Sequence, residues 1–404
     1  MPSQTSASSN GPDSITGRNP DVSIISSGAN LADARLHRLA NALIRAGISV
    51  EIFAPGNLAD APRIPTEAGL SPESEKDVSK LIIHPTSGAF ANGKNLLSRY
   101  HRSRVYSLRA RGKIFYVLSP EAVVPAYFQA KLRRRKIAVD FYEDYLRLLH
   151  DRGWAKKYFG IPGFLAGLDT KAALWFSSRA DLTTVADVQV PPFKAKSRLV
   201  VRNMPDASLL TDSGPRSTRP RAIYIGDMRT SRGLRTMLEA AALAPDWEFD
   251  LVGPIAASDA EYVSQWKIAH SHRSQPVRFH GKLTPRDAWK VAEGAWVGLS
   301  ILELTPAFVE AVPSKLYEYM TVGLATISTP LPRCIDLINR SGAGVIASTA
   351  NEVAAALNLW AGDPESLDEI KDSARSWAKE NLDPVTEYNN LIAQFRRLLS
   401  ELLR

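Results

Sequence analysis

A segment near position 315 carries residues whose types and spacing could do chemistry. Glu310 and Glu318 stand eight positions apart, and Lys315 lies between them. Ser314 is a favourable N-cap residue and Gly323 a favourable helix stop, so the pattern predicts a short helix that begins at Lys315. The free N–H groups and the positive dipole end of a helix attract anions, and Lys315 would add a cation there. We therefore expect an anion site at the start of this helix.

Short apolar runs, typical of buried parallel strands, alternate with helical patterns and would position that segment. In the first unit, a strand at 22–26 precedes a helical pattern at 33–46, a stop at Gly47 and a strand at 50–53. Such βαβ units form doubly wound sheets that bind ligands at the carboxyl ends of their strands. Further strands are expected at 81–83, 114–118, 137–140, 182–185, 199–201, 222–225, 249–252, 277–280, 297–301 and 324–328.

The residues around Lys315 also form a recognisable motif. Glu310 and Glu318 have the form E-x7-E, and Glu318 is part of the pattern P-x-K-x-x-E-Y-M-x-x-G, which runs from Pro313 to Gly323 and precedes an apolar strand. This segment resembles the GT-B glycosyltransferases of the family 4 type. The resemblance implies an α/β fold of two doubly wound Rossmann-like domains that face a central cleft. It also implies sugar transfer from a nucleoside-diphosphate sugar with retention of configuration, the leaving phosphate accepting the acceptor's proton.

Further segments extend the resemblance over most of the chain. Tyr142 departs from it, because many members have histidine there, and a phenol with a pKa of about 10 would have to replace that imidazole. Asp227 stands where the phosphate loop usually has arginine, and Arg229 is the expected substitute. The resembling segments are the helix 33–38, the segments 119–121 and 140–143, the segment 202–206, and the loop 226–233.

The resemblance carries three groups of site residues onto this chain. Cations and helix N–H groups would stabilise the charge on the departing diphosphate. Because no Asp-x-Asp pair ends a strand, we expect no metal, and no cofactor besides the donor substrate. The catalytic group is Glu310, Lys315 and Arg232. The donor-binding group, with Glu318 on the ribose, is Glu318, Ser314, Arg229, Gly226, Gly281 and Lys282. The acceptor-side group is Gly28, Arg35, Tyr142 and Glu143.

Proline, serine, aspartate and glycine crowd 204–220 and predict a linker between two halves. We expect a disordered tail over 1–19 and an acceptor-side Rossmann-like domain over 20–205. A nucleotide-sugar-binding Rossmann-like domain is expected over 206–380, and a C-terminal helix that can pack back on the first domain over 381–404.

The net charge of +8 is concentrated in one stretch. Lysines and arginines crowd the chain from Lys94 to Lys136, where Glu121 is the only acid. Such a stretch can bind nucleic acid, contact anionic lipid, or only keep a surface solvated. Its aromatic residues lack the spacing of a base-stacking platform, so we expect no nucleic-acid partner and favour an anionic membrane surface, which Phe128 and Leu132 could enter. A solvated face without a partner stays the alternative.

Composition excludes several classes of protein. Hydrophobic residues are 45% and charged residues 23% of 404, the balance of a folded protein with two domains. No apolar run reaches the roughly 18–20 residues of a membrane span, and the N-terminus lacks the features of a signal peptide. The single cysteine, Cys334, excludes an intrachain disulfide and a cysteine-based zinc site. We expect a cytoplasmic enzyme, at most peripheral on the inner face of the cell membrane, that acts on a glycan or lipid-linked acceptor in bacterial polysaccharide or envelope assembly.

Other interpretations stay open at this point. A sugar-nucleotide epimerase could have the same architecture, and the charge alone would suit a non-enzymatic nucleic-acid-binding protein. A Rossmann dehydrogenase is disfavoured because the strand-to-helix turns lack G-x-G-x-x-G. At the level of residues, Arg229 and Arg232 could be plain loop cations, and Asp33, Arg35 and Arg38 could form an ion-pair set on the first helix.

Overall fold

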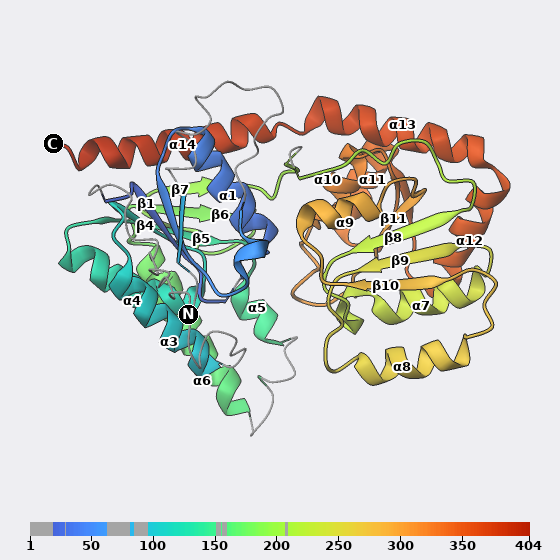
Figure 1. Cartoon of the computed structure of the whole chain (residues 1–404), viewed down its shortest axis with the longest axis horizontal. Helices are drawn as coiled ribbons and strands as arrows, with labels where there is room; N and C mark the ends of the chain where they lie inside the picture. Colours follow the sequence, from blue (N-terminus) through green and yellow to red (C-terminus); the bar gives the residue numbers. More distant parts are fainter. Residues whose placement is uncertain are drawn as a thin grey trace, which may run out of the picture.

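Two parallel β-sheets, each covered by helices, make up the protein in the computed structural model (Figure 1). The structure describes residues 19–28, 30–62, 81–84, 96–150, 155, 160–206 and 209–404. The strand order is β3-β2-β1-β4-β5-β6-β7 in the first sheet and β10-β9-β8-β11-β12-β13 in the second. Two doubly wound α/β domains, as the sequence predicts, are therefore confirmed.

The first sheet is built from short strands, most of them buried at nearly every position. Val22 of β1 pairs with Val50 of β2 on one side and with Ile114 of β4 on the other. Strands that are buried on both faces need cover on both sides of the sheet, which the surrounding helices provide. The strands are β1 (Val22–Ile25), β2 (Val50–Phe53), β3 (Leu81–His84), β4 (Ile114–Val117), β5 (Lys136–Phe141), β6 (Leu182–Val185) and β7 (Arg198–Val200).

Successive residues of these strands enter two different cores. Ile24 and Ile52 pack into a core with α1 and the C-terminal helix α14 (Pro384–Glu401), whereas Ile25 and Phe53 pack into a core with α3, α4 and α6. Alternation of side chains along each strand produces this division. The N-terminal helices are α1 (Ala34–Arg45), η1 (Leu58–Asp60), α3 (Leu96–Arg109), α4 (Pro120–Leu132), α5 (Tyr145–His150) and α6 (Ile161–Ser177).

The second sheet has β8 and β11 at its centre. Its strands are β8 (Arg221–Ile225), β9 (Glu248–Val252), β10 (Val277–Gly281), β11 (Val297–Ser300), β12 (Ala325–Ser328) and β13 (Gly344–Ile346). Its helices are η5 (Thr230–Arg232), α7 (Leu234–Leu243), α8 (Ala260–Ala269), α9 (Pro285–Val291), α10 (Ser314–Thr321), α11 (Pro332–Ser341), α12 (Ala350–Gly362) and α13 (Pro364–Asn381).

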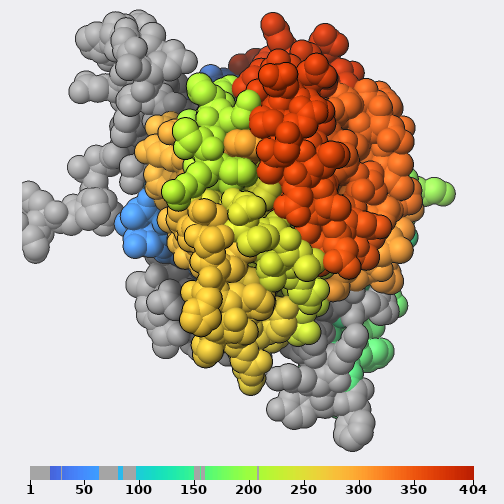
Figure 2. Space-filling model, turned by 90° about the vertical axis from the view of Figure 1, so that its right-hand side faces the viewer, coloured from blue at the N-terminus to red at the C-terminus, as the bar shows by residue number. Residues whose placement is uncertain are grey.

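The segment before β8 and the end of the chain tie the parts together. Residues around 216 lie against α12 and α13, as the end-on view shows (Figure 2), and Arg216 Nε donates to Asp368 at 2.7 Å. After α13, helix α14 (Pro384–Glu401) returns to the first domain, where Leu391 and Phe395 are fully buried. No helix of the described chain is long and apolar enough to cross a membrane.

Two local expectations differ from the structure. Helix α10 begins at Ser314 rather than at Lys315; Pro313 is its N-cap, and no side chain caps it. Proline fixes a φ suited to the residue that leads into this helix, so a serine cap is not required. Strand β13, at Gly344–Ile346, was not expected from the sequence because three residues give too short a pattern.

Candidate active site

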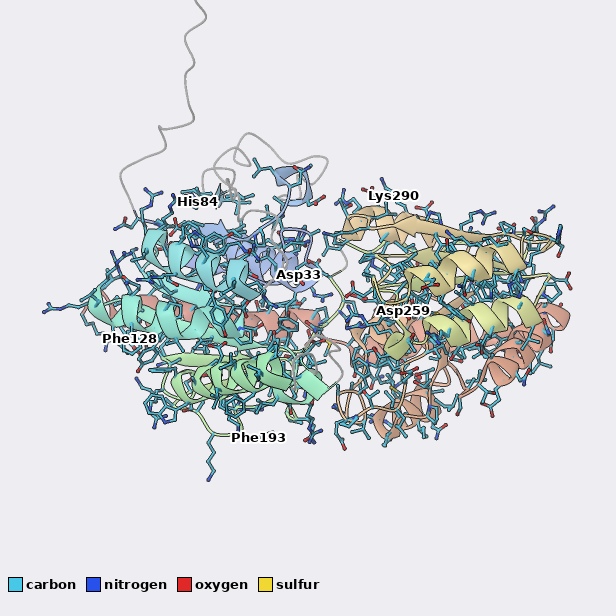
Figure 3. The ribbon with its side chains drawn as sticks, turned by 90° about the horizontal axis from the view of Figure 1, so that it is seen from below. Asp33, His84, Phe128, Phe193, Asp259 and Lys290 are labelled. Carbon is cyan, nitrogen blue, oxygen red and sulfur yellow. The ribbon has the colours of Figure 1, made fainter. Side chains whose placement is uncertain are left out.

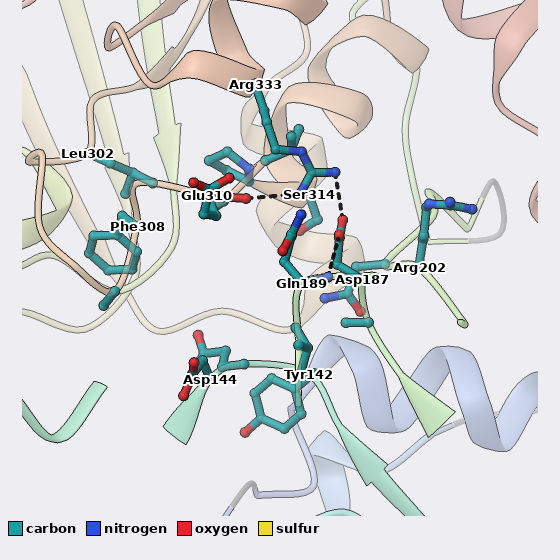
Figure 4. A pocket seen from close by; sticks show the side chains of 18 of the residues that line it. Tyr142, Asp144, Asp187, Gln189, Arg202, Leu302, Phe308, Glu310, Ser314 and Arg333 are labelled. Atoms are coloured by element: carbon teal, nitrogen blue, oxygen red, sulfur yellow. Dashed lines mark hydrogen bonds and ion pairs between the residues drawn. The ribbon is translucent and has the colours of Figure 1, made fainter. Parts of the chain in front are cut away.

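A cavity of about 230 Å³ lies between the two domains (Figure 4). We call it the cleft cavity. It is lined by 142–144 and Asp187 from the first domain, and by Arg232, Phe308 and 310–315 from the second. All of these positions follow the carboxyl ends of strands, at the edge where doubly wound sheets bind ligands.

Lys315 is buried at the start of α10. Its Nζ lies 3.9 Å from the ring centroid of Tyr224 and has no hydrogen-bond partner among the described residues. Burial lowers the pKa of Lys315 to about 7, and the Arg232 guanidinium acts in the same direction. An unpaired ammonium group is unfavourable in such surroundings. The arrangement therefore suits an anionic ligand at the N-terminus of α10.

Gly226 leaves room for that ammonium group. The residue has a φ of +149°, and a Cβ built on it would lie 3.1 Å from the Lys315 Nζ. A side chain at this position would strain the backbone and displace Lys315. The structure thus places Gly226 beside the cation rather than on the wall of the cleft cavity.

Arg232 reaches from η5 toward the first domain. Gly233 ends η5 with a φ of +78°, and a Cβ there would clash with the carbonyl oxygen of Ile301, so only glycine fits. The Arg232 Nη2 lies 3.7 Å from Glu143 Oε1. Its Nε is buried and lacks a hydrogen-bond partner among the residues described. Two cations, Arg232 and Lys315, therefore approach the same cavity.

Glu310 and Ser314 line the same cavity. The Glu310 side chain is exposed, and its backbone carbonyl accepts a hydrogen bond from Arg333 Nη1 at 2.9 Å. Arg333 Nη2 donates to Asp187 at 2.8 Å, which forms an ion pair between the domains (Figure 4). Ser314 is the first residue of α10, so its N–H belongs to the free amides of the helix N-terminus.

Glu318, the expected ribose ligand, does not line the cleft cavity. Its carboxylate accepts a hydrogen bond from Arg38 Nη1 of α1 at 2.8 Å. The two side chains are 15% and 6% exposed, respectively. In this conformation the carboxylate is engaged in an ion pair between the domains.

A second cavity of about 450 Å³ lies next to the first, and we call it the side cavity. It shares Tyr142, Glu143, Leu148 and Arg232 with the cleft cavity. Hydroxyl, carboxylate and guanidinium groups make it suited to a polyhydroxylated ligand. Gly28 also lines the side cavity. The other polar residues that line it are Asp33, Arg99, Tyr100, Glu121, Tyr145, Asp169, Thr170, Asp227 and Arg229.

Tyr142 lies where the two cavities meet. Burial raises the pKa of Tyr142 above its usual range, and the Asp33 and Glu143 carboxylates raise it further. The hydroxyl is therefore protonated at neutral pH. It can donate a hydrogen bond to a ligand but cannot act as a base in place of a histidine.

Arg35, which was expected on the acceptor side, lies away from both cavities. Its guanidinium is buried, and Nε and Nη2 donate to the two oxygens of Asp140 at 2.7 and 2.6 Å. Nη1 donates to Asn203 Oδ1 and to the Val201 carbonyl. Saturated in this way, Arg35 lines neither cavity and holds α1 against β5, whereas Gly28 does line the side cavity.

The remaining candidates lie at different distances from the centre of the site. Arg229 lines the side cavity, and its Nη2 donates to Asp227 at 2.6 Å. Gly281 and Lys282, at the end of β10, are exposed and line neither cavity. No group of three or more His, Cys, Asp or Glu among the described residues could hold a metal ion. The cleft cavity brings together Glu310, Ser314, Lys315, Arg232, Tyr142 and Glu143.

Sequence reasoning missed several lining residues. Asp187 follows the carboxyl end of β6, and Arg333 begins α11 after β12, so the position of both relative to strands could have identified them. Tyr100 and Asp169 hydrogen-bond each other in the side cavity but come from α3 and α6. Only the packing of these helices brings that pair together, and no local signal would find it.

Comparison with known proteins identifies the chemistry. Residues 209–377 match the model of the family described as "Glycosyl transferases group 1". This match includes the whole second sheet and α10. The matched second domain is that of a glycosyltransferase. A search of the curated proteins finds no match to it.

Solved structures share the fold of most of the chain. Sucrose-phosphate synthase from Thermosynechococcus elongatus has a TM-score of 0.66 at 15% identity, covering 95% of this chain and 100% of its own. HepE of Anabaena, in complex with UDP and glucose, has a TM-score of 0.64 at 14% identity, covering 94% and 100%. A TarM mutant from S. aureus, in complex with Fondaparinux, α-GlcNAc-glycerol and UDP, has a TM-score of 0.55 at 12% identity, covering 74% and 59%. The glycosyltransferase therefore has the GT-B fold, as expected.

Proposed function

We propose that this glycosyltransferase moves a sugar from a nucleoside-diphosphate sugar to a hydroxyl of a glycan or lipid-linked acceptor in bacterial polysaccharide or envelope assembly. The observation that supports this most is the buried, unpartnered ammonium group of Lys315 beside Arg232 at the N-terminus of α10. Ammonium, guanidinium and free helix amides converge on one cavity, and this combination matches a diphosphate. The buried Cys334 fits a reducing, cytoplasmic location.

The same groups would act on the leaving diphosphate. As the glycosidic bond breaks, negative charge develops on the phosphate oxygens, and positive groups fixed in advance stabilise it. Lys315, Arg232 and the Ser314 amide supply that charge in our proposal, which requires neither a metal nor a cofactor. Glu310 faces the transferred sugar, and Glu318 binds the ribose after its ion pair with Arg38 opens.

The acceptor would enter through the side cavity and meet the donor at Tyr142. Because Tyr142 stays protonated, it positions a hydroxyl by donating a hydrogen bond and takes no proton. Glu143 lies 3.7 Å from Arg232 and can accept a hydrogen bond from the acceptor, so we assign it an orienting role. We propose that the leaving phosphate accepts the acceptor's proton, with retention of configuration.

Ligands of similar proteins suggest which donors to test first. HepE was solved with UDP and glucose, and TarM with UDP and Fondaparinux. UDP, GDP and ADP, each with its nucleoside, form a suitable first panel. The nucleoside diphosphate that binds with the highest affinity is called the reference nucleotide.

Calorimetry on Lys315→Ala tests the proposal. The variant should lose about 1.5–3 kcal/mol of binding free energy for the reference nucleotide, the magnitude of a charged hydrogen bond, but little for the nucleoside. Lys267→Ala, which removes a cation at the surface of α8, is the matched control and should bind both like the unsubstituted protein. Equal losses for nucleotide and nucleoside in Lys315→Ala would contradict the diphosphate assignment.

A further inference from the structure

One face of α6 carries apolar side chains into solvent. Ile161, Phe164, Leu165, Leu168 and Trp175 are between 49% and 68% exposed. Their spacing of three, four and seven residues places them in one stripe along the helix. The opposite side of α6, with Ala166 and Ala173, is buried, whereas the side chains of the stripe are about half exposed or more. Contiguous exposed apolar surface of this kind marks an interaction site.

Helix α4 extends the stripe. It packs beside α6, and the rings of Phe128 and Phe176 lie 5.4 Å apart. Phe128 is 58% exposed and Leu132 is 78% exposed. Figure 3 shows α3, α4 and α6 side by side on this side of the first domain, with Phe128 on α4. We call the exposed residues of α4 and α6 the α4–α6 face.

Most of the charges around the α4–α6 face are positive, although the buried Asp181 lies 3.8 Å from Lys131 Nζ. The Arg179 guanidinium lies 3.6 Å above the Trp175 ring, and Lys171 is exposed on α6. The acids of α3, α4 and α6 are Glu121, which is buried and bound by Arg99, and Asp169, which lines the side cavity. The cations around the face are Lys131, Arg134, Arg135, Lys171 and Arg179.

The structure changes how the basic stretch of the sequence is understood. Lys94 lies outside the described residues, Arg102 is buried against the Ser27 carbonyl, and Lys113 binds Asp21 at 2.8 Å. Contacts remote in sequence thus engage several cations of the stretch in which a contact with anionic lipid was expected. The apolar stripe on α6, outside that stretch, becomes the principal feature.

We propose that the α4–α6 face docks on an anionic lipid bilayer. Aromatic and aliphatic side chains flanked by lysine and arginine have the chemistry of an interfacial segment, and each such cation near an anionic surface contributes about 1 kcal/mol. A second copy of the chain fits less well. A two-fold contact through this face would bring the cations of one copy toward those of the other.

The α4–α6 face lies next to the side cavity through which the acceptor would enter. This part of the inference rests on the proposed function. Ala166, Asp169 and Thr170 of α6 and Tyr100 of α3 line the side cavity. The helices that face the bilayer thus also form the wall past which an acceptor would enter. A lipid-linked acceptor would reach Tyr142 without leaving the membrane surface.

Vesicle flotation tests the docking. The full-length protein should bind vesicles of phosphatidylcholine with phosphatidylglycerol about tenfold more strongly than phosphatidylcholine alone, and binding should fall steeply with salt. The double substitution Phe164→Ser with Leu168→Ser should weaken binding about tenfold, and Lys171→Glu with Arg134→Glu should do the same. All four positions are exposed or at the surface, so folding should survive, which melting curves can verify.

Matched substitutions on the other domain provide the control. Ile268→Ser with Leu359→Ser removes two exposed apolar side chains, and Lys379→Glu reverses an exposed charge, so both should leave flotation unchanged. Reference-nucleotide binding, measured in parallel, should be the same in every variant, so that failure of donor binding is distinguishable from failure of docking. The proposal would be overturned if flotation did not change with lipid charge or with the α6 substitutions. It would also be overturned if the unsubstituted protein were a dimer that dissociates in Phe164→Ser with Leu168→Ser.

Discussion

Lys315 occupies surroundings in which a charged side chain lowers the stability of the folded protein. Its folded pKa is about 7, whereas an exposed lysine has a pKa of about 10.4. The unfolded chain therefore binds more protons than the folded chain between these values, so this group makes stability rise with pH across that window. Below pH 7 the full penalty is present. Such a residue is retained for binding rather than for folding.

Lys315→Met should therefore stabilise the unliganded protein. The free energy of unfolding should increase on the order of 3 kcal/mol at pH 6–7, and the gain should shrink as the pH rises and vanish above a pH of about 10.4, where the unsubstituted lysine is neutral in both the folded and the unfolded chain. Urea unfolding at several pH values measures this. Lys267→Met is the control and should change little. A destabilised Lys315→Met at pH 6 would show that the ammonium group has a favourable partner.

At the scale of the elements, an ion pair between Arg38 of α1 and Glu318 of α10 connects the two domains. The Glu318 carboxylate in this pair is the group that we propose binds the ribose. Arg38→Gln should free this carboxylate and tighten binding of the reference nucleotide about threefold to tenfold, the effect of removing one competing hydrogen bond. The gain should be absent for the 2′,3′-dideoxy analogue. Arg45→Gln, also on α1 but half exposed, is the matched control. Weaker binding in Arg38→Gln would mean that the ion pair supports the site.

The turn from η5 into α7 depends on one glycine. Gly233 and Gly214 have similar φ values, +78° and +64°, but a Cβ would meet the Ile301 carbonyl only at Gly233 and open space at Gly214. Gly214→Ala should lose about 1 kcal/mol through the left-handed backbone alone. Gly233→Ala should lose about 2–4 kcal/mol and weaken nucleotide binding, because Arg232 would move. Equal losses in the two variants, by urea unfolding, would contradict this.

The sequence predicts the helices and strands better than it predicts the contacts of their side chains. The apolar runs predicted nearly every strand, and Ser314, Lys315 and Gly323 placed α10 within one residue, because these signals are local. The contacts of Arg35 and Glu318 depend on Asp140 and Arg38, which lie 105 and 280 positions away. Polar residues of one helix can turn to the core, to a partner domain or to solvent, and only tertiary packing decides among these.

At the scale of the molecule, α14 makes the last residues of the chain part of the first domain. Phe395 is fully buried, and its ring lies 5.0 Å from that of Tyr116 in β4. Leu391 and Leu398 enter the same core. The reference nucleotide, in contrast, would bind chiefly to the second domain through α10. The two ends of the molecule can therefore be perturbed separately.

Phe395→Ala should consequently destabilise the first domain by about 3–5 kcal/mol, the usual effect of removing a buried aromatic ring. Val385→Ala, on the exposed start of the same helix, should change stability by less than about 0.5 kcal/mol. Two probes can separate the domains, because six of the eight tryptophans, at 247, 266, 289, 296, 360 and 377, belong to the second domain, so that fluorescence reports chiefly on that domain. In Phe395→Ala, unfolding followed by circular dichroism should begin at lower urea than unfolding followed by tryptophan fluorescence, and the reference nucleotide should raise the fluorescence transition more than the start of the circular-dichroism transition. Coincident transitions would instead show that the cleft contacts make the two domains unfold as one unit.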